Sequence, residues 1–235
     1  MLVLRYYREL LPLPPLINNL LSKTKYTRKE NMRTHNKKSQ SEITPTDALV
    51  YLKEGNVRFI NNLRANRNLL NQVNETSDGQ FPFAVILSCI DSRTSAELIF
   101  DQGLGDIFSV RVAGNIVNED ILGSMEYACK VAGSKLVVVL GHSKCGAVTS
   151  ACQHAEMGNV TGLLRKIQPA VQQVEAEVGI IDTEEKVQRV ANINVDIALA
   201  EIRAKSEILS EMETEGTIKM IGGMYDIETG LVTFN

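Results

Sequence analysis

Two continuous apolar runs, each ending at metal-binding and charged residue types, constrain most strongly what this chain can fold into. The first run, within residues 83–88, leads directly into Cys89-Ile90-Asp91-Ser92-Arg93. The second, at residues 135–140, leads into Gly141-His142-Ser143-Lys144-Cys145-Gly146. Uninterrupted apolar runs of this length are typical of strands buried on both faces of a parallel sheet. Since ligands of open α/β sheets bind beyond the carboxyl ends of the strands, the residues after both runs are candidates for chemistry.

The two motifs together predict a metal site. If the two strands are parallel neighbours, Cys89, His142 and Cys145 converge at one end of the sheet. Two thiolates and an imidazole suit tetrahedral Zn²⁺, and three protein ligands with an open fourth position form the pattern of catalytic zinc sites. Mg²⁺ or Ca²⁺ would instead call for oxygen ligands. The alternative, ordinary buried cysteines and a satisfied histidine, is disfavoured because both motifs fall at strand ends.

The order of the predicted elements indicates an α/β fold, with a mostly parallel central sheet flanked by helices. Strands alternate with helical segments in the central part, which favours parallel strands joined by right-handed crossovers. Two more helical segments and a C-terminal β-hairpin follow. The predicted strands are 83–88, 107–112, 135–140, 217–221 and 231–234, and the predicted helices are 95–100, 121–131, one opening at about 146, 163–178 interrupted by Pro169, and 184–212.

An N-terminal helical arm is expected before the first strand. Thr44, Pro45 and Asp47 form a helix-start signature: a capping side chain, a proline at the first helical position and an acid in the first turn. The apolar pattern then continues to about Leu63. Residues 61–79 are rich in asparagine and are expected to be loop or broken helix.

The first 44 residues differ from the rest of the chain in charge. They hold nine lysines and arginines against three acidic residues, whereas the whole chain has a net charge of −3. The polar, basic stretch 22–41 is expected to be disordered, and Met32 is a possible natural start. The predicted division is a disordered basic extension at 1–43 and one domain at 44–235. The acidic remainder gives no support for nucleic-acid binding.

Cysteine usage and hydropathy bear on location. Four cysteines in 235 residues, two of them in a metal pattern, indicate a reducing compartment rather than a disulfide scaffold. No window holds the roughly 18 apolar residues that a membrane span needs. We therefore predict a cytoplasmic protein with no membrane partner. The remaining cysteines, Cys129 and Cys152, are predicted to be buried small hydrophobes.

The paired motifs also carry a resemblance to a known family. Cys89–Arg93 followed by Gly141–Gly146 resembles the metal site of the β-class carbonic anhydrases. The similarity extends from about Thr44 to the C-terminus, through the segments Glu97–Phe108, Val110–Asn115, Gly123–Ala128 and Ile221–Asp226. Two spaced motifs with their linking segments make this a far more specific signal than either motif alone.

The resemblance implies a function, a cofactor and an assembly. It implies a lyase that reversibly hydrates carbon dioxide to bicarbonate and a proton, with Zn²⁺ held by Cys89, His142 and Cys145. It also implies a homodimer or a higher even-numbered homo-oligomer. In that assembly the helical arm around residues 45–63 is expected to lie across the partner subunit.

Asp91 and Arg93 are the predicted catalytic pair. Asp91 lies two residues past a ligand, so its carboxylate can face the same cavity and accept a hydrogen bond from the activated water. Arg93 can hold that carboxylate ionised and oriented through paired N–H donors. The resemblance implies the same roles, and in some family members the aspartate instead closes the fourth zinc position. An Asp–Arg pair that merely closes a turn is the alternative.

Five residues are predicted to contact substrate, all by resemblance. Gln80 precedes Cys89 by nine residues, where the family has a substrate-orienting glutamine. Gly146 could offer a backbone N–H. The resemblance places three more in the apolar cleft, although aromatic residues at such spacings are as often simple core: Phe108, Ala113 (smaller than the valine often found there) and Tyr127.

The position of Gln80 predicts a shared site. A strand of six residues spans about 20 Å, so Gln80 can hardly reach the zinc ligands at the other end of its own strand. If Gln80 orients substrate, it does so at the metal of a neighbouring subunit. His154 is a candidate proton carrier by residue type alone, and a plain surface histidine is the simpler interpretation.

Three other functions compete with carbon dioxide hydration. Hydrolysis of CS₂ or COS on the same fold is the nearest enzymatic rival, and a side-by-side assay would separate the two. A non-catalytic structural zinc module would want four protein ligands, and only Asp91 could supply the fourth. A zinc nucleobase deaminase is poorly supported because the H-x-E…P-C-x-x-C pattern is missing.

Overall fold

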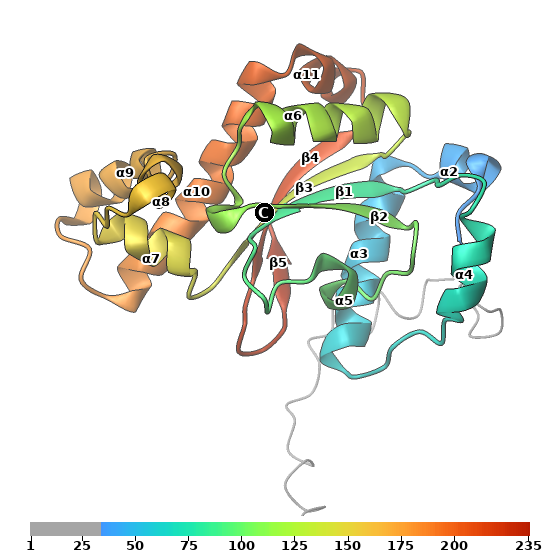
Figure 1. Ribbon diagram of the computed structural model, residues 1–235, viewed down its shortest axis with the longest axis horizontal. Coiled ribbons are helices and arrows are strands. Elements are labelled where there is room, and N and C mark those ends of the chain that lie inside the picture. The colour runs from blue at the N-terminus through green and yellow to red at the C-terminus, as the bar shows by residue number, and fades with distance from the viewer. Residues whose placement is uncertain (1–33) are drawn as a thin grey trace, which may run out of the picture. The chain divides into compact units, whose positions relative to one another are not determined.

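A five-stranded sheet organises residues 34–235, the part of the chain that the computed structural model describes (Figure 1). The strand order is β2-β1-β3-β4-β5, with β1 to β4 mutually parallel and β5 antiparallel to β4. This confirms the predicted α/β fold and its C-terminal hairpin. The strands are β1 (Ala84–Ser88), β2 (Ile107–Arg111), β3 (Leu136–His142), β4 (Lys219–Tyr225) and β5 (Val232–Phe234).

Strand register brings the two motifs together. Ser88, the last residue of β1, pairs with Leu140 of β3 and with Arg111 of β2. Cys89 therefore follows β1 at the level where β3 passes through Gly141 and His142. β3 is longer than predicted, because Gly141 and His142 continue the ladder with β4. His142 is thus a strand residue rather than part of the loop that follows.

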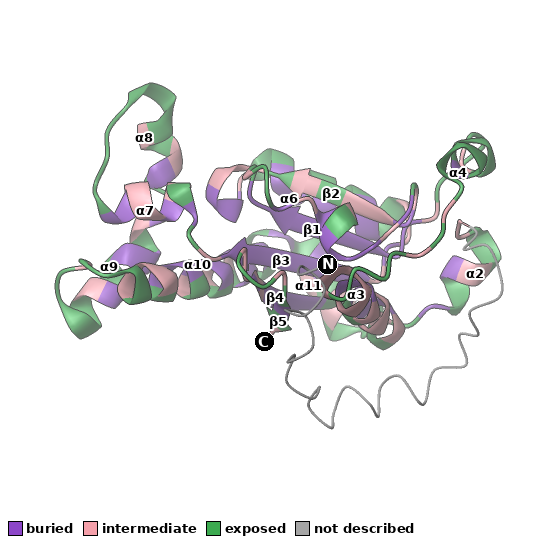
Figure 2. Cartoon of the chain, turned by 90° about the horizontal axis from the view of Figure 1, so that it is seen from below, coloured by how far each residue is buried: buried purple, intermediate pink, exposed green. Residues whose placement is uncertain are grey.

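Helices cover both faces of the sheet. Alternate residues of β1 face opposite sides, which is why an uninterrupted apolar run is needed: Val85 and Leu87 lie in one buried cluster, Ala84 and Ile86 in another. All residues of β1 and β3 are buried (Figure 2). The first face is covered by α6 (Glu119–Glu126), α10 (Glu184–Lys205) and α11 (Glu207–Thr214), and the second by α3 (Pro45–Ile60) and α5 (Ala96–Ile99).

The N-terminal helices confirm one prediction and correct another. α3 begins after Thr44, whose side chain accepts from the Asp47 N–H while Asp47 reaches back, as the sequence signature predicted. A shorter helix, α4 (Leu69–Glu75), lies within the expected loop. The prediction of disorder is wrong for residues 37–42, which form α2 (Lys37–Glu42) behind a capping box of Asn36 and Ser39. The other residues of the predicted extension up to 33 lie outside the described part.

Helix α2 belongs to the body of the fold rather than to an extension. The Gln40 side chain is buried and donates to the backbone carbonyls of Pro82 and Ala132, both at 2.8 Å. Ile43, which follows α2, is buried in the same hydrophobic cluster as Ala84 and Ile86 of β1. These long-range contacts hold α2 against the rest of the fold and explain why a polar segment is ordered.

Three of the predicted helices end or break at other places. Pro169 does not interrupt a helix but lies in the first turn of α9 (Gln168–Val178), after the separate α8 (Gly158–Leu164). The long C-terminal helix stops at Ser206, whose backbone is extended and whose side chain caps α11. The helix predicted at 121–131 begins earlier, as α6, and finishes as the π-helical turn η2 (Tyr127–Val131).

Two short elements complete the end of the sheet at which the motifs meet. The 3₁₀ turn η1 (Ala113–Asn115) follows β2, and α7 (Gly146–Cys152) follows the second motif. α7, α9 and part of α10 form a third buried cluster that includes Cys89 and Cys145. Within residues 34–235, no helix combines the length and the apolar character that crossing a membrane would require.

Candidate metal centre

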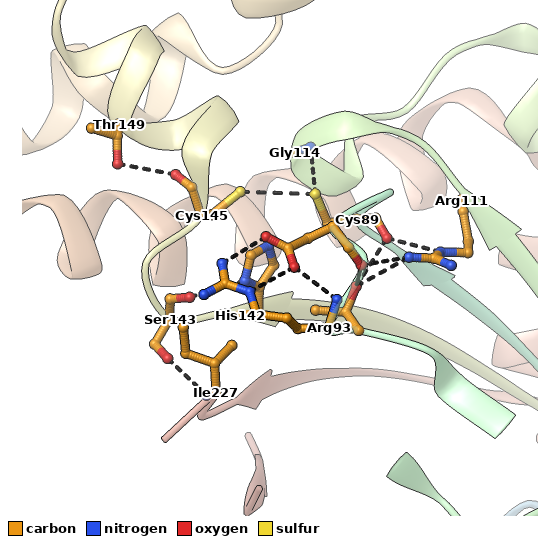
Figure 3. Close-up of polar contacts among 11 residues, drawn as sticks. Cys89, Arg93, Arg111, Gly114, His142, Ser143, Cys145, Thr149 and Ile227 are labelled. Atoms are coloured by element: carbon orange, nitrogen blue, oxygen red, sulfur yellow. Dashed lines mark hydrogen bonds and ion pairs between the residues drawn. The ribbon is translucent and has the colours of Figure 1, made fainter. Parts of the chain in front are cut away.

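Cys89, His142 and Cys145 form a compact group at the carboxyl ends of β1 and β3 (Figure 3). One ligand atom from each side chain lies within 4.8 Å of the other two, and the two sulfurs are 4.0 Å apart. All three side chains are buried, with 4% or less of each residue exposed. The structure thus brings together the three residues predicted as metal ligands, from segments 53 positions or more apart for Cys89 and the second motif.

The ring of His142 is oriented for ligation. Its Nδ1 lies 2.9 Å from the backbone carbonyl of Ser143, and since a carbonyl only accepts, Nδ1 carries the proton. In the neutral ring, which is the form that binds a metal, the other nitrogen Nε2 is then unprotonated. It is fully buried and has no hydrogen-bond partner among the described residues. A buried acceptor without a partner is costly, and a metal ion at this nitrogen removes that cost.

The two sulfurs interact strongly. The hydrogen bond with Cys145 lowers the pKa of the Cys89 thiol to about 4, with further contributions from the His142 side chain and the Gly114 N–H. The same hydrogen bond, together with burial, raises the pKa of Cys145. Two neighbouring buried sulfurs therefore cannot both ionise unaided, whereas a divalent cation between them favours both thiolates. With the unpartnered nitrogen of His142, this donor set fits Zn²⁺.

Hydrogen bonds between side chains and the backbone hold the loop that carries Cys89. The Gly114 N–H donates to Cys89 Sγ at 3.3 Å. Arg111 donates from Nε to the Cys89 carbonyl at 3.0 Å and from Nη2 to the Asp91 carbonyl at 2.6 Å. Thr94 Oγ1 donates to either of these carbonyls, at 3.0 and 2.9 Å. Thr94 and Arg111 were not among the predicted site residues, although Arg111 was recognisable as a charge at the carboxyl end of a predicted strand.

Asp91 and Arg93 form a bidentate pair beside the ligand group. Arg93 donates from Nε to Oδ1 at 2.9 Å and from Nη2 to Oδ2 at 2.7 Å, and its backbone N–H also reaches Oδ1. The side-chain hydrogen bond from Arg93 is the main reason that the pKa of Asp91 is well below its usual range. Asp91 is therefore ionised at neutral pH. It is not a fourth member of the ligand group among the described residues.

The predicted substrate contacts divide into two sets. Ala113 immediately precedes Gly114, and Gly146 follows Cys145, so both lie beside the ligand group along the chain. Phe108 is level with Val85, four residues before Cys89, which is about 13 Å along the strand. Gln80 is exposed and stands before β1, and Tyr127 is 56% exposed. Phe108, Gln80 and Tyr127 are therefore remote from the ligand group or exposed to solvent within one chain.

The remaining cysteines and His154 lie outside the ligand group, although Cys152 of α7 is in the same buried cluster as Cys89 and Cys145. Cys129 and Cys152 are buried free thiols, as predicted. His154 is 62% exposed, and its Nε2 lies 3.6 Å from Glu175 Oε1. No described contact joins it to the ligand group, so its role as a proton carrier gains no support.

Known proteins resemble this chain over most of its length. The model of the carbonic anhydrase family matches residues 84–232. Carbonic anhydrase 2 of Mycobacterium tuberculosis (strain CDC 1551 / Oshkosh) is 37% identical over 189 residues, which cover 79% of this chain and 90% of the relative.

Solved structures show the same relationship. The β-carbonic anhydrase CafA of Aspergillus fumigatus superposes with a TM-score of 0.65 at 26% identity, covering 81% of this chain and 89% of that one. Tetrameric β-carbonic anhydrases from Sordaria macrospora superpose with a TM-score of 0.64 at 24% identity, covering 70% and 89%. The latter similarity is one of fold.

Proposed function

The chain belongs to the β-carbonic anhydrase family, and from this premise we propose that it hydrates carbon dioxide reversibly to bicarbonate and a proton, using a zinc ion. Carbonic anhydrases are lyases, and the chain is an enzyme of that class. One observation carries the proposal: a buried group of two thiols and an imidazole at the carboxyl ends of two parallel strands, in which the imidazole Nε2 has no hydrogen-bond partner within residues 34–235.

Cys89, His142 and Cys145 would hold the metal. Zinc bound there would supply a Lewis acid that lowers the pKa of a coordinated water toward neutrality. The thiolates offset much of the metal's charge, so the residues around them must contribute to activating the water. The residues placed to do so are Asp91 and Arg93.

Asp91 is proposed to orient the nucleophile. Its carboxylate is ionised, and both oxygens are fixed by Arg93, so it presents an acceptor in one direction. A water that donates one hydrogen to Asp91 directs a lone pair toward the carbon of CO₂. Arg93 is the positioning residue, because its two parallel N–H groups restrict rotation of the carboxylate. Loss of that acceptor is expected to lower the reaction rate while the bound zinc is retained.

Gln80, Phe108 and Tyr127 are proposed to complete the site of a partner subunit. Within one chain Gln80 and Phe108 lie before or near the start of their strands, away from the ligands, and Tyr127 is largely exposed. A two-fold homodimer uses the same surface patch on both chains. It would place these three residues of each chain against the metal of the other chain. Ala113 and Gly146, which adjoin the ligands in sequence, are proposed to act within their own chain.

A reducing, cytoplasmic location is part of the same proposal. All four cysteines are free thiols, and two of them must remain unoxidised to bind metal. An oxidising compartment would expose this centre to disulfide formation or thiol oxidation.

The decisive experiment measures zinc and reaction rate together. Purified protein should contain about one zinc per chain by elemental analysis, and should hydrate CO₂ in a stopped-flow assay. CS₂ and COS are assayed in parallel, and hydrolysis of these without CO₂ hydration would assign the rival activity. Stoichiometric zinc with no turnover of any of the three substrates would instead indicate a structural module.

A further inference from the structure

One buried face of α10 carries a polar side chain where only apolar ones are expected. Among the buried residues of α10, a helix that lies wholly in the described part of the chain, Asn194 alone is polar. Its neighbours on that face recur every three or four positions, the spacing of one helix stripe: Val190, Ala191, Val195, Ala198, Leu199 and Ile202. Asn194 is 3% exposed. A buried amide is destabilising unless it is hydrogen-bonded, so its partner indicates why it is there.

The partner is the backbone of the turn beside the metal centre. Asn194 Nδ2 donates to the Gly114 carbonyl at 2.9 Å, across 80 residues of sequence. Because a carbonyl only accepts, the orientation of the Asn194 amide is fixed by this contact. The hydrogen bond is buried, which shields the carbonyl from bulk solvent.

Gly114 has a backbone conformation that favours glycine. Its φ of +69° places it in the left-handed region, and Asn115 follows with a φ of +44°. The conformation calls for glycine, and a Cβ at position 114 would also lie 2.6 Å from Ile167 Cδ1, so that side chain would have to shift. Glycine, however, is the residue least restrained by its own sterics. The turn is closed by the Asn115 N–H, which donates to the Val112 carbonyl at 3.0 Å, and the contact from Asn194 adds a restraint from outside the turn.

The second peptide group at Gly114 reaches a metal ligand. Its N–H donates to Cys89 Sγ at 3.3 Å (Figure 3). The N–H and the carbonyl lie on either side of the Gly114 Cα, so the two hydrogen bonds together hold both peptide groups of this residue in place. A donor to a ligating sulfur orients the sulfur and withdraws charge from it.

We propose that Asn194 is a positioning residue of the metal centre, which holds Gly114 so that the Gly114 N–H remains on Cys89 Sγ. The inference rests on the proposed assignment of Cys89, His142 and Cys145 as metal ligands. α10 then does more than bury one face of the sheet. Its one buried polar side chain, Asn194, links the helix through Gly114 to Cys89, a ligand that lies 105 positions earlier in the chain.

The test uses Asn194→Leu, which keeps the branching and the number of heavy atoms of the side chain but removes the donor. Zinc affinity is measured by competition with a chromophoric chelator, and the expected loss is roughly tenfold, the lower end for partners of metal ligands. The Co²⁺-substituted protein provides the second measurement. Without the N–H donor the Cys89 sulfur is richer in electrons, so the sulfur-to-cobalt charge-transfer band should move to lower energy.

Gln40→Ala is the matched control. Gln40 is also a buried amide that donates to backbone carbonyls, but these belong to Pro82 and Ala132, which are not part of the ligand group. The control should lose thermal stability while zinc affinity and the cobalt band stay unchanged. Asn194→Ala serves as a second variant if the leucine variant does not fold.

The outcomes separate the two proposals. If the wild-type protein shows no thiolate-to-cobalt band, the metal-site assignment is wrong and the role of Asn194 falls with it. If the wild-type protein shows the band, and the folded Asn194 variant keeps zinc affinity within twofold with the band unshifted, only the positioning role is overturned.

Discussion

Cys89 and Cys145 are close without being bonded. Their sulfurs are 4.0 Å apart, about twice the length of a disulfide bond, and both residues are free and buried. The two cysteines also differ in their surroundings: the Cys89 sulfur accepts a hydrogen bond from the Gly114 N–H, whereas Cys145 immediately precedes α7. At the scale of single residues, the chemistry of the centre depends on two sulfurs that can both ionise only with a cation between them.

Replacing Cys89 or Cys145 by serine should remove most of the bound zinc and nearly all activity. A neutral hydroxyl is a poor substitute for a thiolate ligand. Elemental analysis of purified Cys89→Ser and Cys145→Ser checks this directly, with Cys129→Ser as the control because Cys129 lies in a different buried cluster. Full zinc occupancy in either ligand variant would contradict the assignment.

Asp91→Asn should keep zinc but lose activity. The asparagine cannot serve as a charged acceptor, and its NH₂ group repels a donating water. Groups that manage a proton or orient a nucleophile typically contribute about 10²–10⁴-fold in rate, so kcat/KM should fall by at least about 100-fold. Stopped-flow assays from pH 6 to 9, together with zinc content, are the measurements. A variant as active as the parent across this range would leave Asp91 a purely structural residue.

At the scale of elements, the buried carboxylate of Asp101 joins three segments of the chain. Asp101 follows α5 and is 5% exposed. It accepts from Arg58 of α3, from Arg67 Nη1 at 2.6 Å and from the Ala65 N–H at 3.1 Å. Its backbone is left-handed, with a φ of +44°, a conformation that aspartate and asparagine both tolerate. α3, α5 and the segment between α3 and α4 are therefore fixed to one another by Asp101.

This network should make stability depend on pH. Burial raises the pKa of Asp101, but the hydrogen bonds from Arg58, Ala65 and Arg67 lower it by more, so the net shift is downward. A group whose pKa is lower in the folded than in the unfolded state stabilises the fold above the unfolded-state pKa of about 3.9. That contribution is lost as the pH falls through the folded-state value.

Asp101→Asn should accordingly destabilise the protein by about 3 kcal/mol at pH 7, because it leaves two buried or half-buried guanidinium groups without a charged partner. The difference from wild type should shrink below about pH 4. Urea unfolding at pH 7, 5, 4 and 3.5, at one protein concentration, measures it. Asp182→Asn is the control, since its exposed pair with Lys186 is worth little. A difference that is constant with pH would contradict the network's electrostatic role.

At the scale of the whole molecule, the site as proposed is incomplete in one chain. β1 separates Gln80 from Cys89, and the five residues of that strand alone span about 17 Å. β2, which carries Phe108, is an edge strand within the described sheet. A second subunit is therefore proposed to bring Gln80 and Phe108 to the metal.

Mixing inactive Gln80→Ala and Cys89→Ser chains should restore activity. After random exchange of subunits half of the dimers are mixed, and each has one site with intact ligands and an intact partner glutamine. About a quarter of the wild-type activity is expected.

The matched control is a mixture of Cys89→Ser and Cys145→Ser chains, because their ligands belong to one site of one chain and cannot complement. Subunit exchange is established first by mass spectrometry of differently labelled chains. No gain in the first mixture, once exchange is shown, would rule out the shared site.

The sequence by itself determined the sheet and the meeting of the ligands. Strands buried on both faces must be continuously apolar, so β1 and β3 were recognisable from residues 83–88 and 135–140. The ends of parallel neighbours lie at one edge, which brought Cys89 and His142 together. Local signals also sufficed for the start of α3, because a cap and its partner are three residues apart.

Tertiary structure alone decided what depends on distant partners. α2 is ordered through Gln40, whose hydrogen bonds reach 42 and 92 positions along the chain. Arg111 and Asn194 act on the loop of Cys89 and the turn at Gly114 across 22 and 80 positions. A periodic pattern reports which face of a helix is buried, but not which backbone group that face will meet. Those contacts exist only after the elements have packed, because packing fixes the distances between groups that the chain itself leaves free.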